Sequence, residues 1–424
     1  MIASVLPATG MRILLAIHNA YTDATSGAAH SMRILMQWLH DADHDVRVLA
    51  TARTDALPIQ NLDAHLAALE VPLHERPPSL AFVRSVRKPK NMTVGRPTVD
   101  FTLAGVPVTM LKTRAPMRSH AEELECEQFL FLLDALLDEF APDVLVTYGG
   151  TPLVQETLRR ARRRGVTCVF SLRNHGYEDR RYFEHVDHVF TTSPYLSDLY
   201  RETIGLHSTG LESPIDWDDV EAPEEMRRFV TFVNPSVQKG AMLFARLAEM
   251  LGSRRPDIPM LVVQSAASAG SLNAIPGFDF RKYPHIMAAP GTTRPCEFFA
   301  LTRLLLVPTI TREPFGRVAA ESLVNGIPPL VSDRGALPQT VHGAGRVISL
   351  PEWMTPTSTA LPSEAETQPW FDAVCELWDD PGLYAEASAL ARRTAAEVYG
   401  EPVLRKRYLD YFETLTASNA PLFP

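Results

Sequence analysis

Two carboxylates eight positions apart give this sequence its clearest chemical signal. Glu313 and Glu321 enclose the segment Pro-Phe-Gly-Arg-Val-Ala-Ala, residues 314–320. An apolar run, residues 304–307, precedes them, and a helical pattern that ends at Gly326 follows. A strand, a glycine turn and a helix start leave backbone N–H groups that suit a phosphate, and the two acids suit sugar hydroxyls. This combination predicts a nucleotide-sugar site.

Such a turn must be positioned by alternating strands and helices, and the chain shows two series of them. The first begins as a βαβ unit, with a strand at residues 12–17, a helix that ends near His40 and a strand at residues 45–50. This pattern predicts a parallel sheet with a right-handed crossover. Further strands of this series are expected at residues 143–148, 166–172 and 188–192, with a hairpin at residues 99–110 that turns near Ala104-Gly105.

The second series restarts after a break that is rich in Pro, Asp and Glu, around residues 210–228. Its strands are expected at residues 229–233, 260–264, 285–288, 304–307 and 329–332, with helices at residues 241–251 and 317–325. At 424 residues the chain is too long for one ordinary core. We therefore expect an N-terminal Rossmann-like domain (1–220), a C-terminal Rossmann-like domain (221–400) and a final helical segment (401–424).

Composition excludes several classes of protein. The apolar content of 46% and charged content of 21% are those of a soluble globular protein. The net charge of −9 argues against a nucleic-acid binder, which would be basic. The four cysteines have no CxxC spacing, and the start of the sequence lacks the regions of a signal peptide. We expect a soluble, cytoplasmic protein.

Three short motifs in a fixed order make the sequence resemble a known family. They are Lys239-Gly240, the Glu313 to Glu321 pair, and Ser332-Asp333. In this respect the chain is similar to glycosyltransferase family 4, a family of retaining enzymes with the GT-B fold. The resemblance implies an α/β architecture of two facing Rossmann-like, doubly wound domains with an interdomain cleft. The nucleotide sugar would bind mainly to the second domain and the acceptor mainly to the first, and the final helix (401–424) would cross back to the first domain.

The resemblance gives each acid a role. Glu313 would bind hydroxyls of the donor sugar, and Glu321 would bind the ribose of the nucleotide. Each acid also has an ordinary structural interpretation. Glu313 could stabilise the following helix N-terminus, and Glu321 could form a surface pair with Arg317 one turn away.

The turn and a lysine would hold the diphosphate. By resemblance, backbone groups of Phe315, Gly316, Arg317 and Val318 face the diphosphate and sugar, although the same residues could simply connect a strand to a helix. Lys239 would neutralise the diphosphate as it leaves. The arginine that family members carry shortly before this lysine is absent from residues 233–239. Its substitute is left open between two residues, Arg294 and Arg312.

The first domain contributes two further candidates by resemblance. Gly27 occupies the loop that brings N–H groups to the phosphate, and His175 would lie near the donor sugar and the reacting centre. Asp216 matches the end of a family segment between the domains, where a hinge role is the better interpretation.

Two charged motifs are interpreted as surface features. Asp41 and Asp43 form a DxD pattern, but they follow a helix instead of a strand, so no metal site is predicted. Residues 159–164 contain five arginines. This run is open to two interpretations, peripheral contact with an anionic membrane or a solvated helix face, and the acidic net charge favours the second.

The predicted function is metal-independent transfer of a sugar from a nucleoside diphosphate sugar, most simply a UDP- or GDP-sugar, to a hydroxyl acceptor. The anomeric configuration would be retained through front-face attack. His175, Glu313 and Lys239 would be the catalytic residues. The alternatives are a sugar-nucleotide epimerase or phosphorylase of the same fold, and a catalytically silent sugar-nucleotide binding protein. Neither the acceptor nor the oligomeric state follows from the sequence.

Overall fold

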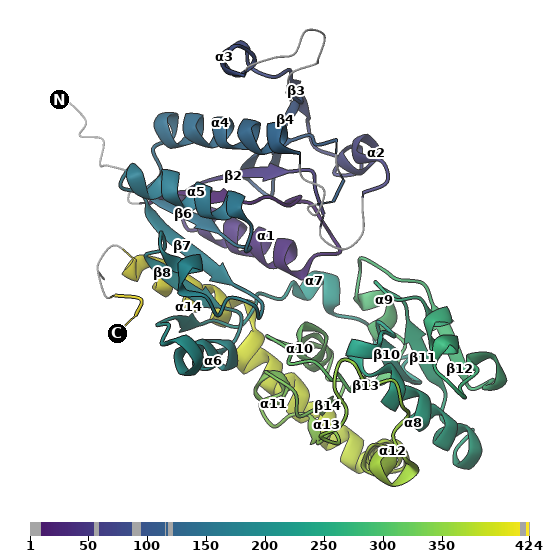
Figure 1. Cartoon of the computed structure of the whole chain (residues 1–424). Coiled ribbons are helices and arrows are strands. Elements are labelled where there is room, and N and C mark those ends of the chain that lie inside the picture. Colours follow the sequence, from purple (N-terminus) through teal and green to yellow (C-terminus); the bar gives the residue numbers. More distant parts are fainter. Residues whose placement is uncertain are drawn as a thin grey trace. The chain divides into compact units, whose positions relative to one another are not determined.

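The computed structural model describes residues 10–54, 59–86, 95–114, 116–117, 122–415 and 421–423. The chain divides into two compact units (Figure 1). Unit 1 comprises residues 1–191, 197–209 and 405–424, and unit 2 comprises residues 192–196 and 210–404. The expected boundary near residue 220 lies inside the long segment of unit 2, because α7 (Trp217–Val220) packs on helices of that unit.

Unit 1 is built on a sheet with the strand order β3-β4-β5-β2-β1-β6-β7-β8-β9. The strands from β5 to β8 in this order pair in parallel, whereas β3-β4 and β4-β5 are antiparallel. The predicted hairpin is confirmed, since Ala104 and Gly105 at its turn have φ of 48° and 79°. The strands are β1 (Arg12–Ala16), β2 (Asp45–Thr51), β3 (His74–Arg76), β4 (Thr98–Leu103), β5 (Val106–Leu111), β6 (Val144–Thr147), β7 (Thr167–Leu172), β8 (His188–Thr191) and β9 (Thr209–Gly210).

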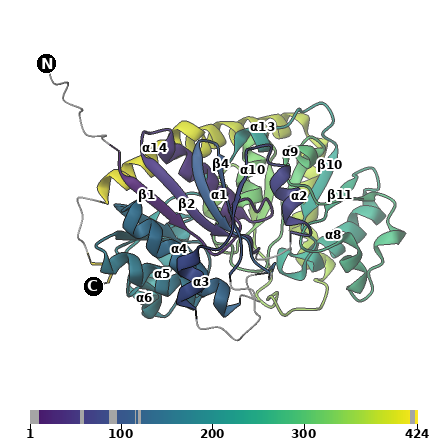
Figure 2. The ribbon, with the colours of Figure 1, turned by 90° about the horizontal axis from the view of Figure 1, so that it is seen from above.

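Helices cover both faces of this sheet. In two views α4 and α5 lie on one face, whereas α1 and the unit 1 part of α14 lie on the other (Figures 1 and 2). Tyr408 of α14 packs against Trp38 and Phe190, with ring centroids 6.1 and 5.8 Å away. The helices are α1 (Gly27–His40), α2 (Leu62–Ala67), α3 (Leu80–Ser85), α4 (Glu123–Glu139), α5 (Pro152–Arg163), η2 (Arg180–Phe183), α6 (Pro194–Ile204) and α14 (Glu401–Thr414).

Unit 2 contains a second, fully parallel sheet with the order β12-β11-β10-β13-β14-β15. Its strands are β10 (Phe229–Val233), β11 (Met260–Val263), β12 (Ile286–Ala289), β13 (Thr302–Val307), β14 (Pro329–Ser332) and β15 (Arg346–Ile348). Its helices are α7, η3 (Val237–Lys239), α8 (Ala241–Arg254), η4 (Ala269–Ala274), η5 (Phe280–Lys282), α9 (Cys296–Phe299), α10 (Arg317–Val324), α11 (Leu337–Thr340), α12 (Glu364–Asp379), α13 (Pro381–Thr394) and η6 (Ala395–Tyr399).

The core of unit 2 explains why its strands read as unbroken apolar runs. Every residue of β11 and β14 is buried, as expected when helices cover both faces of a parallel sheet. Phe232 of β10 stacks on Phe244 of α8 with ring centroids 4.8 Å apart. Trp370 of α12 is fully buried in the same cluster. The predicted α/β fold class is confirmed.

The arginine run belongs to a helix face that is charge-compensated. Residues 159–163 lie on α5, which begins at Pro152. Arg160 pairs with Asp134 of α4, and Arg162 pairs with Asp187 at 2.7 Å. Arg159 pairs with Glu156 and Arg164 with Asp138. These ion pairs agree with the solvated-face interpretation.

Two other surface expectations can be compared with the structure. Asp41 is the C-cap of α1, and Asp43 has φ of 64° just before β2 begins. The pair thus lies at the amino edge of the sheet, away from the carboxyl edge where ligands of such sheets bind. Among the described residues, no helix has both the length and the apolar character needed to cross a bilayer.

Candidate active site

The predicted lysine and glutamates of unit 2 lie where its strand order reverses. From β10 the chain builds outward through β11 and β12, and then returns to β13 on the other side of β10. Ligands of open α/β sheets bind at the carboxyl ends of the strands at such a point. The loops after β10 and β13 touch there, since Ile310 N donates to Gln238 O at 3.0 Å.

Lys239 and Glu313 come together at this edge. Lys239 ends η3, whose N-cap Ser236 accepts the Lys239 N–H at 3.3 Å. Its ammonium forms an ion pair with the Glu313 carboxylate, and the exposed fractions of the two side chains are 37% and 12%. The two groups assigned to diphosphate and to sugar are therefore each other's partners in this structure. A bound donor would have to separate them.

The backbone of the glutamate turn (residues 313–316) is fixed through its carbonyl groups. Ala336 N donates to Glu313 O at 2.8 Å, and Ser193 Oγ donates to Pro314 O at 2.5 Å. Thr340 Oγ1 donates to Phe315 O. With three consecutive carbonyl oxygens bonded to protein, the turn is preorganised, and this rigidity favours electrostatic stabilisation of a ligand's charge.

Gly316 and Phe315 show why these residue types are needed. Gly316 is the N-cap of α10 with φ of 90°, a left-handed conformation, and a Cβ there would lie 2.6 Å from Leu337 Cδ2. The Phe315 side chain is buried against Tyr399, at a centroid distance of 5.9 Å. Phe315 can therefore reach a ligand only through its backbone. Arg317 and Val318 begin α10, where N–H groups have no carbonyl one turn earlier in the helix.

Glu321 is buried, contrary to the surface interpretation of its pairing with Arg317. Its residue exposure is 6%, and its Oε1 lies 3.7 Å from Arg317 Nη1. Burial raises the pKa of Glu321 to about 7, although the nearby Arg317 opposes the rise. Arg317 also donates to Pro214 O at 3.2 Å. A half-ionised carboxyl group in such a site can both accept and donate hydrogen bonds to hydroxyls.

An uncharged residue, Asn234, lies where the family arginine is absent. Asn234, directly after β10, has φ of 59°, and its Oδ1 accepts the Ala267 N–H at 3.2 Å. The two candidate substitutes differ in their place in the sheet. Arg312 follows β13, which adjoins β10, whereas Arg294 follows β12, which β11 separates from β10. The fold therefore puts Arg312 closer to the lysine loop.

The two predicted residues of unit 1 lie at the carboxyl edge of its sheet. Gly27 is the first residue of α1, whose N-cap Ser26 accepts the Ala29 N–H at 3.3 Å. His175 is half-buried in the loop after β7. Tyr200 holds that loop, because its hydroxyl accepts the Tyr177 N–H and bonds to Asn174 O, both at 3.1 Å.

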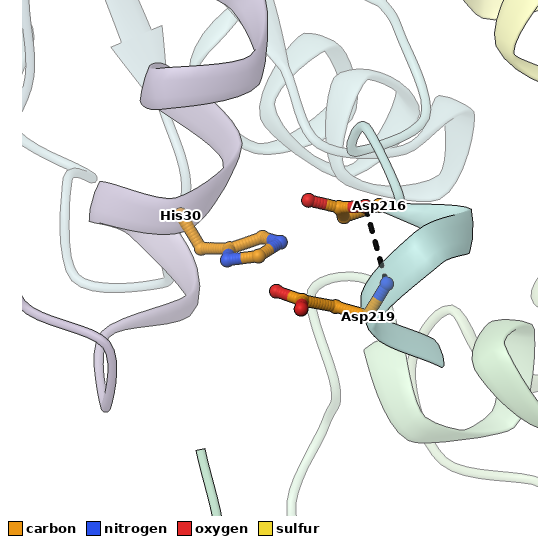
Figure 3. A group of neighbouring side chains, drawn as sticks. All are labelled: His30, Asp216 and Asp219. Atoms are coloured by element: carbon orange, nitrogen blue, oxygen red, sulfur yellow. Dashed lines mark hydrogen bonds between the residues drawn. The ribbon is translucent and has the colours of Figure 1, made fainter. Parts of the chain in front are cut away.

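Asp216 is the N-cap of α7. Its carboxylate caps α7 and accepts the N–H groups of Asp218 and Asp219 at 3.1 and 3.3 Å (Figure 3). This capped helix lies within unit 2. Asp216 is not among the residues that surround the glutamate turn.

Several residues that shape the turn were not predicted. Three of them, Thr192, Ser193 and Thr340, donate hydrogen bonds to carbonyl oxygens of the turn. The fourth, Tyr399, donates a hydrogen bond of 2.6 Å to Thr340 O. They lie from 25 to more than 100 residues away from the turn in sequence. No local pattern marks them.

A family model matches one part of the chain. Residues 26–212, which include most of unit 1, match the family model described as Glycosyl transferase 4-like domain. Comparison with curated protein sequences finds no match. Residues 26–212 are therefore similar to a Glycosyl transferase 4-like domain, and the two parallel-sheet units have the GT-B fold of solved glycosyltransferases.

Solved structures show the same fold over nearly the whole chain. A glycosyltransferase from Rickettsia africae ESF-5 has 10% identity and a TM-score of 0.64, covering 96% of this chain and 99% of its own. Sucrose-phosphate synthase from Thermosynechococcus elongatus has 14% identity, a TM-score of 0.64 and the same coverage. HepE from Anabaena, in complex with UDP-glucose, has 13% identity and a TM-score of 0.63, covering 95% of this chain and 99% of its own.

Proposed function

We propose that this protein transfers a sugar from a nucleoside diphosphate sugar to a hydroxyl group of an acceptor, with retention at the anomeric carbon. The observation that carries the proposal is the meeting of Lys239 with Glu313 on a turn whose carbonyls are fixed. That meeting lies at the switch point of a parallel sheet. UDP or GDP is the proposed nucleotide, and the UDP-glucose complex of HepE supports UDP.

In the proposed mechanism, donor binding separates the ion pair. Lys239 turns to the diphosphate, and Glu313 accepts hydrogen bonds from sugar hydroxyls. The bond between the anomeric carbon and the β-phosphate oxygen breaks while the acceptor oxygen bonds to the same face of that carbon. The acceptor proton passes to the departing diphosphate oxygen. Lys239 and the N–H groups at the start of α10 stabilise the charge that develops there.

The remaining residues bind and orient. Glu321 bonds the ribose hydroxyls, and the first turn of α10 binds the diphosphate. His175 and Gly27, in unit 1, act on the donor sugar and the phosphate. The lysine and the helix N-terminus supply the charge stabilisation that a metal ion gives in other transferases. We therefore propose that no metal is required. A reducing, cytoplasmic setting is proposed because the cysteines are free thiols.

The test begins with binding and donor breakdown. UDP-, GDP-, ADP- and TDP-glucose are screened by thermal shift, since a ligand of the native state raises its stability. The nucleotide sugar that binds is then followed for slow release of nucleoside diphosphate and free sugar, with and without EDTA. Release of sugar with the donor's anomeric configuration, read by NMR before mutarotation, supports retention. The inverted anomer contradicts it, and loss of release in EDTA contradicts metal independence.

The substitution Glu313→Ala separates chemistry from nucleotide binding. It is expected to abolish donor breakdown while leaving the affinity for the free nucleoside diphosphate within about twofold, because Glu313 contacts the sugar. Breakdown at the normal rate would show that the role of Glu313 is wrong. An epimerase would instead yield an altered sugar, and a phosphorylase would need inorganic phosphate. A silent binder would show binding with no release at all.

A further inference from the structure

The carbonyl oxygen of Pro314, in the middle of the glutamate turn, is held by two hydroxyl groups from a remote part of the sequence. Ser193 Oγ donates to it at 2.5 Å and Thr192 Oγ1 at 3.3 Å. Both residues are buried, with 2% and 4% of their surface exposed. A carbonyl oxygen has two lone pairs, so two hydroxyl donors satisfy it. The turn is therefore fixed at its centre as well as at its ends.

The direction of the Ser193 hydroxyl is itself determined. Ser193 Oγ accepts the Leu196 N–H at 3.2 Å, as a residue at the start of α6 can. Because a lone pair of the oxygen receives that helix N–H, its hydrogen is directed to Pro314. The serine thus links the first turn of α6 to the glutamate turn through one oxygen atom.

This link lies at a place where the chain passes between the two units. Residues 192–196 belong to unit 2, whereas the residues immediately before and after them belong to unit 1. The segments of unit 2 beside the other two crossings are bonded to the start of α10 or to the supports of the turn. Pro214 O, shortly after the passage at residues 209–210, receives Arg317 Nη1 at 3.2 Å. Tyr399, shortly before the passage at residues 404–405, supports Phe315 through Thr340.

We propose that Ser193, assisted by Thr192, is a positioning residue for the transfer reaction. By holding the Pro314 carbonyl, it sets the direction of the Glu313 carboxylate and of the N–H groups that begin α10. It does not touch the substrate. The inference rests on the proposed function and adds to it a specific dependence of the chemical step on the chain segment after β8.

The physical reason is the steep dependence of catalysis on geometry. Glu313 directly precedes Pro314, and Gly316 follows two residues after it, so a shift of the Pro314 peptide unit moves both the sugar-binding acid and the helix start. A misplacement of about 1 Å at a reacting centre can cost about 100-fold in rate. Binding of a free nucleoside diphosphate depends less on this turn, because two of its proposed contacts, Lys239 on η3 and the buried Glu321 on α10, lie outside the turn.

The test compares Ser193→Ala with Ser197→Ala in the full-length protein. Ser197 is a matched control because it is buried on α6, four residues after Ser193, and its Oγ donates to Ser208 O at 2.8 Å. The substrate is the nucleotide sugar that the wild-type protein breaks down. Ser193→Ala is expected to lower kcat about tenfold or more and to change the affinity for free nucleoside diphosphate less than about twofold. Ser193→Thr, which keeps the hydroxyl, restores kcat, and Ser197→Ala leaves it unchanged.

Three results would overturn the proposal: an unchanged kcat in Ser193→Ala, equal losses in both alanine variants, or a loss confined to KM and nucleotide affinity. A wild-type protein that breaks down no nucleotide sugar counts against the proposed function instead. In that case amide hydrogen exchange at residues 315–318 still tests the link. Faster exchange in Ser193→Ala alone supports it, and equal exchange in both variants refutes it.

Discussion

Glu321 should make the stability of unit 2 depend on pH in a way that one substitution removes. Burial raises the pKa of this carboxyl group from 4.5 to about 7. Between these values the unfolded chain has lost the proton while the native protein retains it, so stability falls as pH rises. At about 1.4 kcal/mol for each pH unit, the difference corresponds to about 3 kcal/mol. This loss is complete above about pH 7.

The variant Glu321→Gln is nearly isosteric and stays neutral. At pH 4 to 5 it should be about as stable as the wild type, and above pH 7 it should be more stable by up to about 3 kcal/mol. Unit 2 has 5 residues in 192–196 and 195 in 210–404, or 200 in all. For a domain of this size each kcal/mol moves Tm by about 2–4 °C, so the expected gain at pH 8 is about 6–12 °C.

Thermal unfolding of both proteins between pH 4 and pH 8 measures this effect. Glu352→Gln is the matched control, because Glu352 is exposed in the same unit. Its curve should stay parallel to that of the wild type throughout. A Tm difference between Glu321→Gln and the wild type that does not change with pH would refute the reasoning. So would a variant that is less stable at pH 8.

Two further predictions concern charges. Arg312→Ala should raise the donor KM about tenfold, because a charge-assisted hydrogen bond contributes about 1.5–3 kcal/mol, whereas Arg294→Ala should change KM less than about twofold. Equal effects in steady-state kinetics would contradict the assignment drawn from strand order. In unit 1, Arg53 and Glu125 form an ion pair at 2.6 Å with side chains only 1% exposed. Glu125→Ala should cost about 3–5 kcal/mol in denaturant unfolding, because it strands the arginine's charge, and the paired change to Arg53→Met with Glu125→Leu should cost less. A single variant that is more stable than the double would oppose this.

Most of the strands, and the helices α1, α8 and α10, could be predicted because their signals are local. A strand that is buried on both faces of a parallel sheet needs consecutive apolar residues, as at residues 304–307. Such a run can be recognised in the sequence. The hairpin turn at Ala104-Gly105 follows from the left-handed backbone that its two residues adopt. The short edge strands β3 and β15 were missed, because three residues carry too little pattern.

The environment of the candidate site could not be predicted in the same way. Glu321 and Arg317 are one helical turn apart, which the sequence shows, but whether they lie in water or in the core depends on what packs over α10. The five arginines from residue 159 to 164 suggested a basic surface. Acids on α4 and near β8 pair with Arg160, Arg162 and Arg164, and Glu156 on α5 itself pairs with Arg159. Charge along a helix is local, whereas its compensation comes from neighbours that only folding supplies.

The sequence by itself determined the class of fold and the Glu313–Glu321 spacing, because strand and helix periods and a glycine turn are properties of adjacent residues. Only the tertiary structure decided that Lys239 meets Glu313 across 74 positions of sequence. It alone decided that Ser193, 121 positions away, holds the carbonyl of Pro314. Contacts of this kind form because β10 pairs with β13 in the parallel sheet and because remote segments pack on the turn. A one-dimensional pattern contains no distance between residues so far apart.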